Sequence, residues 1–161
     1  MQEVDYNNYK VPTMGSFLKL EQGDNKIRIC SKPIELKYVE ISGKGEKYAT
    51  ENIENEAEEK EAILSGKKIK VRYAYLVINR ADGKLYIWEC GISIFRDILT
   101  YATNPEYGDP TQYDLNINKS GEKLSTRYMI VPARKSTPFT ESEIEMIATN
   151  EGMLREQYKQ K

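Results

Sequence analysis

The chain has 161 residues, with 24 basic and 25 acidic side chains, two cysteines and no histidine. This length predicts one domain with a substantial hydrophobic core. Two cysteines are too few for a disulfide framework or a metal centre, and without histidine the chain lacks the commonest general base and a common zinc ligand. The sequence also contains no P-loop and no dinucleotide fingerprint. We therefore expect a protein that is not an enzyme, with no catalytic residues, no metal and no cofactor.

The formal net charge of −1 conceals an uneven distribution of charge. The segment 51–61 contains six glutamates and one lysine, and residues 141–161 contain five glutamates and three basic residues. The rest of the chain has 20 basic and 14 acidic side chains. A mildly basic body is compatible with a polyanionic partner, although charge runs are most often solvated surface.

The N-terminus lacks the apolar region of a signal peptide, and no segment is long and apolar enough to span a membrane. We expect a soluble, cytoplasmic protein with no membrane partner.

The first half of the predicted domain consists of extended segments that follow an irregular arm over residues 1–16. Residues 17–20 predict a short strand or clamp. Residues 26–30 alternate, with Ile27 and Ile29 on one face and Lys26 and Arg28 on the other. Residues 34–41 resume the extended run, and a turn at 42–45 leads into 46–50, so these segments could form a small hairpin. The acidic insertion 51–66 follows and predicts a short surface helix or a loop.

The central feature is a predicted hairpin over residues 67–90, because Asp82-Gly83 separates two runs rich in β-branched and aromatic residues. If these are the two loop residues, Val77 lies opposite Trp88. One face then carries aliphatic side chains that we assign to the core. The other face carries four aromatic rings, namely Tyr73, Tyr75, Tyr86 and Trp88. These rings are either exposed, as base stacking requires, or packed in the core, and the sequence does not decide which face is exposed.

After this hairpin, apolar residues at helical spacing predict a helix over 93–103 with Ser93 as its N-cap and Leu99 on its apolar face. Residues 112–118 and 124–131 predict two further strands. A capping box of Thr140 and Glu143 predicts a C-terminal helix that begins at Glu141.

This order of strands and helix is that of an OB fold, a five-stranded barrel with one helix between its third and fourth strands. Other small barrels and α+β sheets share the same order. We therefore predict a mainly β protein with a further C-terminal helix. The predicted divisions are an N-terminal arm (1–16), an OB-fold domain (17–135) and a C-terminal helix and tail (136–161).

Three segments in this order resemble bacteriophage single-stranded DNA-binding proteins with an OB fold, of the helix-destabilising type. They are residues 17–29, residues 73–89, and a third segment marked by Tyr107-Gly108-Asp109-Pro110, Tyr113, Gly121, Tyr128 and Pro132. The resemblance implies sequence-independent binding of single-stranded DNA in replication or recombination, in a bacterial host cell, with replication or recombination proteins as partners. One departure is the C-terminus, which lacks the strongly acidic tail of many family members.

Rings beside cations are what unstacked bases and their phosphates require, and stacking accepts RNA as well as DNA. The candidate binding residues are Arg28, Lys70, Arg72, Tyr73, Tyr75, Tyr86, Trp88, Lys119, Lys123, Arg127 and Tyr128. The alternative function is an OB-like protein-interaction or assembly module that binds no nucleic acid. The sequence does not indicate the oligomeric state.

Overall fold

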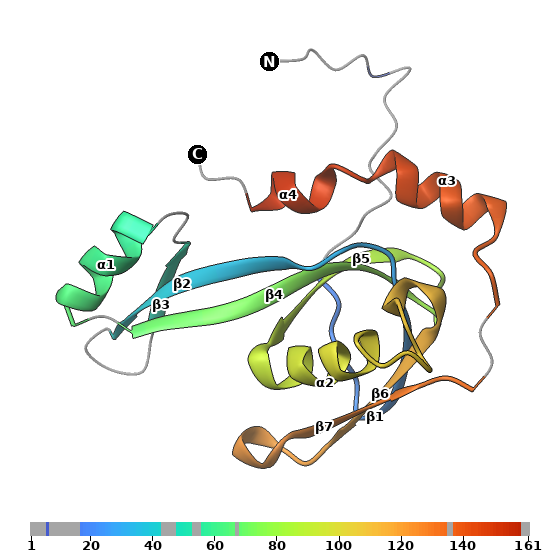
Figure 1. Cartoon of the computed structure of the whole chain (residues 1–161), viewed down its shortest axis with the longest axis horizontal. Coiled ribbons are helices and arrows are strands. Elements are labelled where there is room, and N and C mark those ends of the chain that lie inside the picture. The colour runs from blue at the N-terminus through green and yellow to red at the C-terminus, as the bar shows by residue number, and fades with distance from the viewer. Residues whose placement is uncertain are drawn as a thin grey trace.

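The computed structural model describes residues 6, 17–42, 48–52, 56–66, 68–134 and 137–158. Within these ranges the chain is mainly β, as predicted, and seven strands form one antiparallel sheet (Figure 1). Six strands follow the order β3-β2-β4-β1-β6-β7, and β5 pairs with the other edge of β4. The strands are β1 (Gly23–Ile29), β2 (Ile34–Ser42), β3 (Tyr48–Asn52), β4 (Lys68–Asn79), β5 (Leu85–Gly91), β6 (Asp114–Ser120) and β7 (Arg127–Pro132).

The long strand β4 is the centre of the sheet. Its C-terminal end pairs with β1, where Ile29 lies opposite Val77, and its N-terminal half pairs with β2, where Ile34 lies opposite Ala74. The other edge of β4 pairs with β5 over seven positions. The N-terminal end of β4 and strands β2 and β3 extend beyond the main body, next to helix α1 (Glu56–Leu64), as Figure 1 shows. We call this extension the β2–β4 arm.

The sheet is not closed into a barrel, because β7 has no ladder with β5 among the described residues. The segment 17–20 lies beside β5 instead. Phe17 forms an isolated parallel bridge with Ile87, and the Leu18 N–H donates to the Ile87 carbonyl at 2.8 Å. The mainly β class is therefore confirmed, whereas the closed five-stranded barrel is not.

The β4–β5 hairpin exists, but its predicted register is wrong by two residues. Val77 lies opposite Tyr86 rather than Trp88, and Trp88 lies opposite Tyr75. The loop contains four residues, 80–83, because the Asn79 N–H donates to the Lys84 carbonyl. A shift of two leaves every side chain on its predicted face, since side chains alternate with a period of two.

Both faces of this hairpin are buried. The face with the aromatic rings packs in one core cluster with Ile27, Leu115 and Ile117. The aliphatic face packs in a second cluster, under helices α3 (Glu141–Thr149) and α4 (Met153–Gln157), which supplies Leu154. Of the two alternatives for the aromatic face, Tyr75 and Trp88 take the core, since they are 3% and 2% exposed.

The predicted helices are present, with shifted ends. Helix α2 (Ile92–Ala102) has Gly91 rather than Ser93 as its N-cap. It buries Ile98 against the first core cluster, whereas Leu99, which the helical spacing places on the apolar face, is 46% exposed. Helix α3 begins at Glu141 with both hydrogen bonds of the predicted capping box.

Candidate nucleic-acid interface

A groove of about 820 Å³ lies where a closed barrel would join β5 to β7. One wall is formed by the end of β5 and the first turns of α2, and the other by the β6–β7 hairpin. Leu18 and Leu20 also line the groove. Five of the eleven predicted binding residues lie here, namely Arg72, Trp88, Lys119, Arg127 and Tyr128.

The alternation of β6 and β7 places two of these side chains side by side. The cross-strand pair Ile117 and Ile130 faces the core, and two positions further along, Lys119 lies opposite Tyr128 on the same face. Because side chains alternate along a strand, this face continues from the core into the groove. The hairpin therefore presents a cation next to an aromatic ring at the groove wall.

The cations of the groove differ in how tightly they are held. Arg127 is exposed and makes no ion pair with a described residue. The Lys119 Nζ donates to the Leu20 carbonyl at 3.3 Å. Two carboxylates, those of Glu89 and Asp97, also line the groove, so its net charge is weakly positive.

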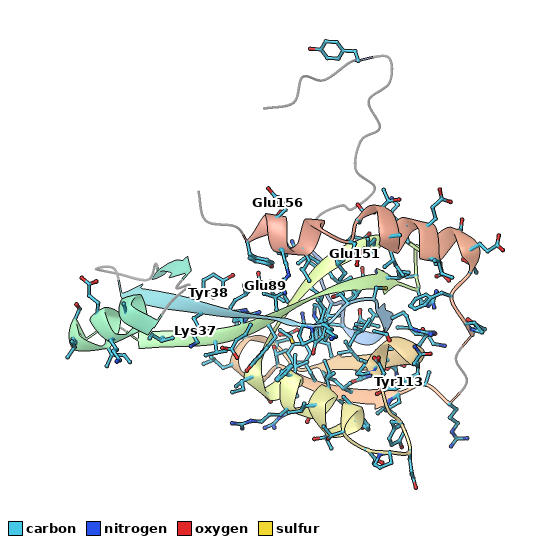
Figure 2. The ribbon with its side chains drawn as sticks, turned by 45° about the horizontal axis from the view of Figure 1, so that its top comes forward. Lys37, Tyr38, Glu89, Tyr113, Glu151 and Glu156 are labelled. Atoms are coloured by element: carbon cyan, nitrogen blue, oxygen red, sulfur yellow. The ribbon has the colours of Figure 1, made fainter. Side chains whose placement is uncertain are left out.

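Arg72 is held by Glu89. Its Nε lies 3.8 Å from the Glu89 Oε1, and its Nη2 donates to the Glu89 carbonyl at 3.4 Å. The Glu89 carboxylate also accepts a hydrogen bond from the Tyr38 hydroxyl at 2.9 Å. Figure 2 shows Tyr38 and Glu89 close together beside the β2–β4 arm. Burial raises the pKa of Tyr38, and the hydrogen bond and charge of Glu89 add to the rise. A phosphate would have to compete with Glu89 for Arg72.

Arg28 lies at the opposite end of the β1–β6 ladder and is 2% exposed. Its guanidinium pairs with Asp114 at 3.3 Å and donates to the carbonyls of Thr111 and Thr137, both at 2.9 Å. It also lies over the Phe139 ring, 4.5 Å from the centroid. With these contacts Arg28 has no access to a phosphate, and its place in the fold is structural.

Asp114 also connects this end of the sheet to α3. It accepts from Arg80 Nε at 3.1 Å, and Arg80 pairs in turn with Glu143. Burial opposes the charged form of Glu143, but hydrogen bonds from the Thr140 backbone and from Arg80 outweigh it, so the pKa of Glu143 is lowered. The network therefore fixes the start of α3 on the sheet.

The aromatic candidates are mostly held by packing. Tyr73 stacks on Phe95 of α2, with ring centroids 3.7 Å apart. Tyr75 stacks on Trp88, which lies at the floor of the groove. The Tyr86 hydroxyl donates to Asp82 in the hairpin loop, away from the groove. Among the aromatic residues predicted to bind, Tyr128 alone both lines the groove and is exposed, with 39% of its surface accessible.

The two remaining candidates are exposed lysines outside the groove. Lys70 lies in the β2–β4 arm, opposite Tyr38. Lys123 lies in the loop between β6 and β7, next to the groove residues Thr126 and Arg127.

Several groove residues are not among the binding candidates that the sequence indicates. Leu18 and Leu20 belong to the predicted clamp, and alternation places Met129 on the outer side of its strand, so the pattern alone gives no reason to choose them. Outside the groove, Leu124 falls in a predicted strand but lies in a short 3₁₀ turn, η2 (Lys123–Ser125), and is fully exposed. Its alternation with Tyr128 and Ile130 predicts a strand face, and we find no sequence signal that separates the two structures.

Metal-ligand clusters and reactive thiols are two further kinds of site that the described residues could have formed. These residues contain no group of three or more acidic or cysteine side chains that could hold a metal ion. Burial raises the pKa of each thiol, Cys30 and Cys90, to about 12, so both stay protonated and poorly nucleophilic near neutral pH. No helix among the described residues is long and apolar enough to cross a membrane.

Comparisons of this chain with protein-family models, with curated proteins and with solved structures find no match.

Proposed function

We propose that this chain is a sequence-independent single-stranded DNA-binding protein that takes the strand into the groove between β5 and β7. The observation that carries the proposal is the convergence of Lys119, Arg127 and Tyr128 on that groove. A basic groove attracts the phosphate backbone, and a base stacked on a tyrosine contributes roughly 1–3 kcal/mol whatever its identity. RNA meets the same two requirements, so the proposal covers both nucleic acids.

We further propose that the sheet is an open form of the OB arrangement. In this assignment β1 and β2 form its long first strand, β4 and β5 its second and third, and β6 and β7 its fourth and fifth, with α2 between the third and fourth. The antiparallel pairs of β4 with β1, β2 and β5, and of β6 with β1 and β7, support this assignment. The pair missing from a closed barrel is β5 with β7, and its place is the groove.

The family resemblance adds a biological context to this proposal. A phage or prophage protein that coats single strands would act during replication or recombination in the bacterial cytoplasm, beside the proteins of those processes. The described parts of the acidic stretch, at the end of β3 and in α1, lie beside β2 and the N-terminal end of β4 and do not line the groove. This placement leaves the groove cations accessible to a polyanion.

A paired substitution tests the site. Lys119→Met with Arg127→Met removes two groove cations while keeping side-chain length, and we expect oligo-dT affinity at low salt to fall by roughly tenfold or more. The matched control is Lys26→Met with Lys84→Met, which makes the same change in net charge at exposed positions outside the groove. Fluorescence anisotropy of labelled oligo-dT measures both variants. Equal losses in the two variants would show that binding is diffuse and that the groove is not the site.

The second candidate function is a protein-interaction module, and one observation favours it. Met129 and Val131 are 66% and 45% exposed on the outer face of β7, where they form an apolar strip. Exposed apolar patches mark interaction sites when they are large. This function requires no nucleic-acid binding, so a wild-type protein that leaves oligo-dT anisotropy unchanged at low salt would favour it over the first.

A further inference from the structure

The loop between β6 and β7 presents a leucine to solvent. Leu124 is fully exposed, with a relative accessibility of 105%. Complete exposure leaves the apolar surface of the leucine in water, where burial would be favourable. The side chain is thus placed where an apolar partner would cover it.

This loop is built to hold its shape. The Ser125 N–H and hydroxyl both donate to the Glu122 carbonyl at 2.9 Å, and the Thr126 N–H donates to the Lys123 carbonyl at 3.2 Å. From the β1 side, Gln22 Nε2 donates to the Gly121 carbonyl at 2.8 Å. Leu124 therefore projects from a braced turn.

Gly121 shows how tightly the turn is folded. Its φ is +79°, and a Cβ at this position would lie 2.1 Å from the Ser125 carbonyl oxygen. Neither the backbone conformation nor the space admits a side chain, so glycine is required here. The chain geometry itself fixes the direction in which the loop points.

The charges around Leu124 indicate what kind of partner reaches it. Lys123 precedes it at the tip, and Arg127 and Lys119 lie at the base of the loop, where they line the groove. Glu122 is the one carboxylate within the loop itself. An apolar tip with one cation beside it and two more at the base of its loop suits a partner with phosphates outside and apolar base faces inside, which describes the end of a nucleic-acid duplex.

We propose that Leu124 is a strand-separating wedge, which inserts at the junction where a duplex opens into the single strand held in the groove. Proteins that insert apolar side chains between base steps unstack those steps, and the lost stacking costs free energy. Here the single strand bound by Lys119, Arg127 and Tyr128 would offset that cost. The inference rests on the proposed function, because the wedge acts only on a strand that the groove holds.

The wedge differs from passive destabilisation, in which a protein melts duplexes only by trapping single strands. Passive melting depends on single-strand affinity alone. A wedge also destabilises the duplex at the junction, and this destabilisation does not depend on single-strand affinity alone. A variant that keeps the affinity and loses strand separation therefore distinguishes the two.

The experiment uses the full chain and two probes, labelled oligo-dT and a forked duplex with a dT tail and a fluorophore–quencher pair at the fork. We expect Leu124→Ala to bind oligo-dT within about twofold of wild type, since the leucine lies outside the groove. We expect the protein concentration for half-separation of the fork to rise at least about fivefold. Leu124→Phe should restore separation, because a ring stacks on the terminal base pair.

The matched control is Leu64→Ala in α1, a second leucine that is 87% exposed, which should behave as wild type with both probes. Fork separation by Leu124→Ala equal to that of wild type would overturn the wedge. A parallel loss of oligo-dT affinity would also overturn it, because Leu124 would then belong to the single-strand site. A wild-type chain that binds no oligo-dT would refute the proposed function itself, which is a different result.

Discussion

The two ends of the β1–β6 ladder hold their cations in opposite ways. At one end Arg28 is buried between Asp114, two carbonyls and a phenyl ring, and at the other end Lys119 donates to a backbone carbonyl beside an open groove. In the sequence both residues are equal candidates for phosphate binding. The difference follows from the residue on the paired strand, because Asp114 lies opposite Arg28 and pairs with it, whereas Gly23 lies opposite Lys119.

The largest expected effect comes from breaking the buried end. Asp114→Asn removes the charge that Arg28 and Arg80 share, and leaves a buried guanidinium without a described carboxylate partner. Removing one member of a buried pair typically costs about 3–5 kcal/mol. We expect the free energy of unfolding, measured in urea, to fall by that amount. Lys119→Met is the control at the open end and should change it by less than about 0.5 kcal/mol.

The next effect concerns the aromatic ring of the open end. Tyr128→Leu removes the exposed ring of the groove while keeping an apolar side chain, so oligo-dT binding should weaken by about 1–3 kcal/mol. Tyr86→Leu is the matched control, because this tyrosine bonds to Asp82 away from the groove. Anisotropy titrations at one salt concentration compare the two variants. If Tyr86→Leu weakened binding more than Tyr128→Leu, the strand would lie near the β4–β5 loop and not in the groove.

A smaller effect is the pH dependence of the buried end. The pKa of Glu143 is below its ordinary value of 4.5 in the folded protein, so the group stabilises the fold above pH 4.5. That contribution is lost as the pH falls from 4.5 through the lowered value, because the folded carboxylate must then take up a proton. Glu143→Gln should remove this part of the acid sensitivity.

Urea unfolding of wild type and Glu143→Gln at neutral and acidic pH measures the contribution of this carboxylate. The stability difference between the two proteins should be larger at neutral pH and shrink in acid. A difference that stays constant with pH would show that Glu143 does not titrate with the fold.

The smallest effect concerns the solvent accessibility of one buried thiol. Cys90 is 1% exposed at the floor of the groove, and burial raises its pKa to about 12. We expect an alkylating reagent at mildly alkaline pH to leave Cys90 unmodified in the native protein and to modify it in urea. Rapid native labelling, read by mass spectrometry of the Cys90 peptide, would mean that the groove opens more deeply than the structure shows.

Local patterns predicted much of the fold. Alternation in β1 and β6, the Asp-Gly hairpin and the Thr140–Glu143 capping box all depend on residues close in sequence, and each feature is present. The assignment of residues to the two faces of the hairpin is correct despite the wrong register, because the register error was two residues. The burial of both faces could not be predicted, because α3 and α4, which cover the aliphatic face, come more than 50 positions further along the chain.

The candidate site was only partly predictable for the same reason. Lys119, Arg127 and Tyr128 come from one hairpin, so their proximity follows from local pairing. Arg28 could not be separated from them, because its burial depends on Asp114 and Thr137, which are distant in the sequence. The burial of Trp88 similarly depends on the helix and strands that enclose the first core cluster.

The most direct test of the proposed function is the binding of wild-type protein to labelled oligo-dT as a function of salt. We predict a clear anisotropy increase at low salt, an affinity that falls steeply between about 50 and 200 mM salt, and much weaker binding of a duplex of equal length. No increase at low salt would contradict single-strand binding in the groove, and so would an affinity that does not change with salt.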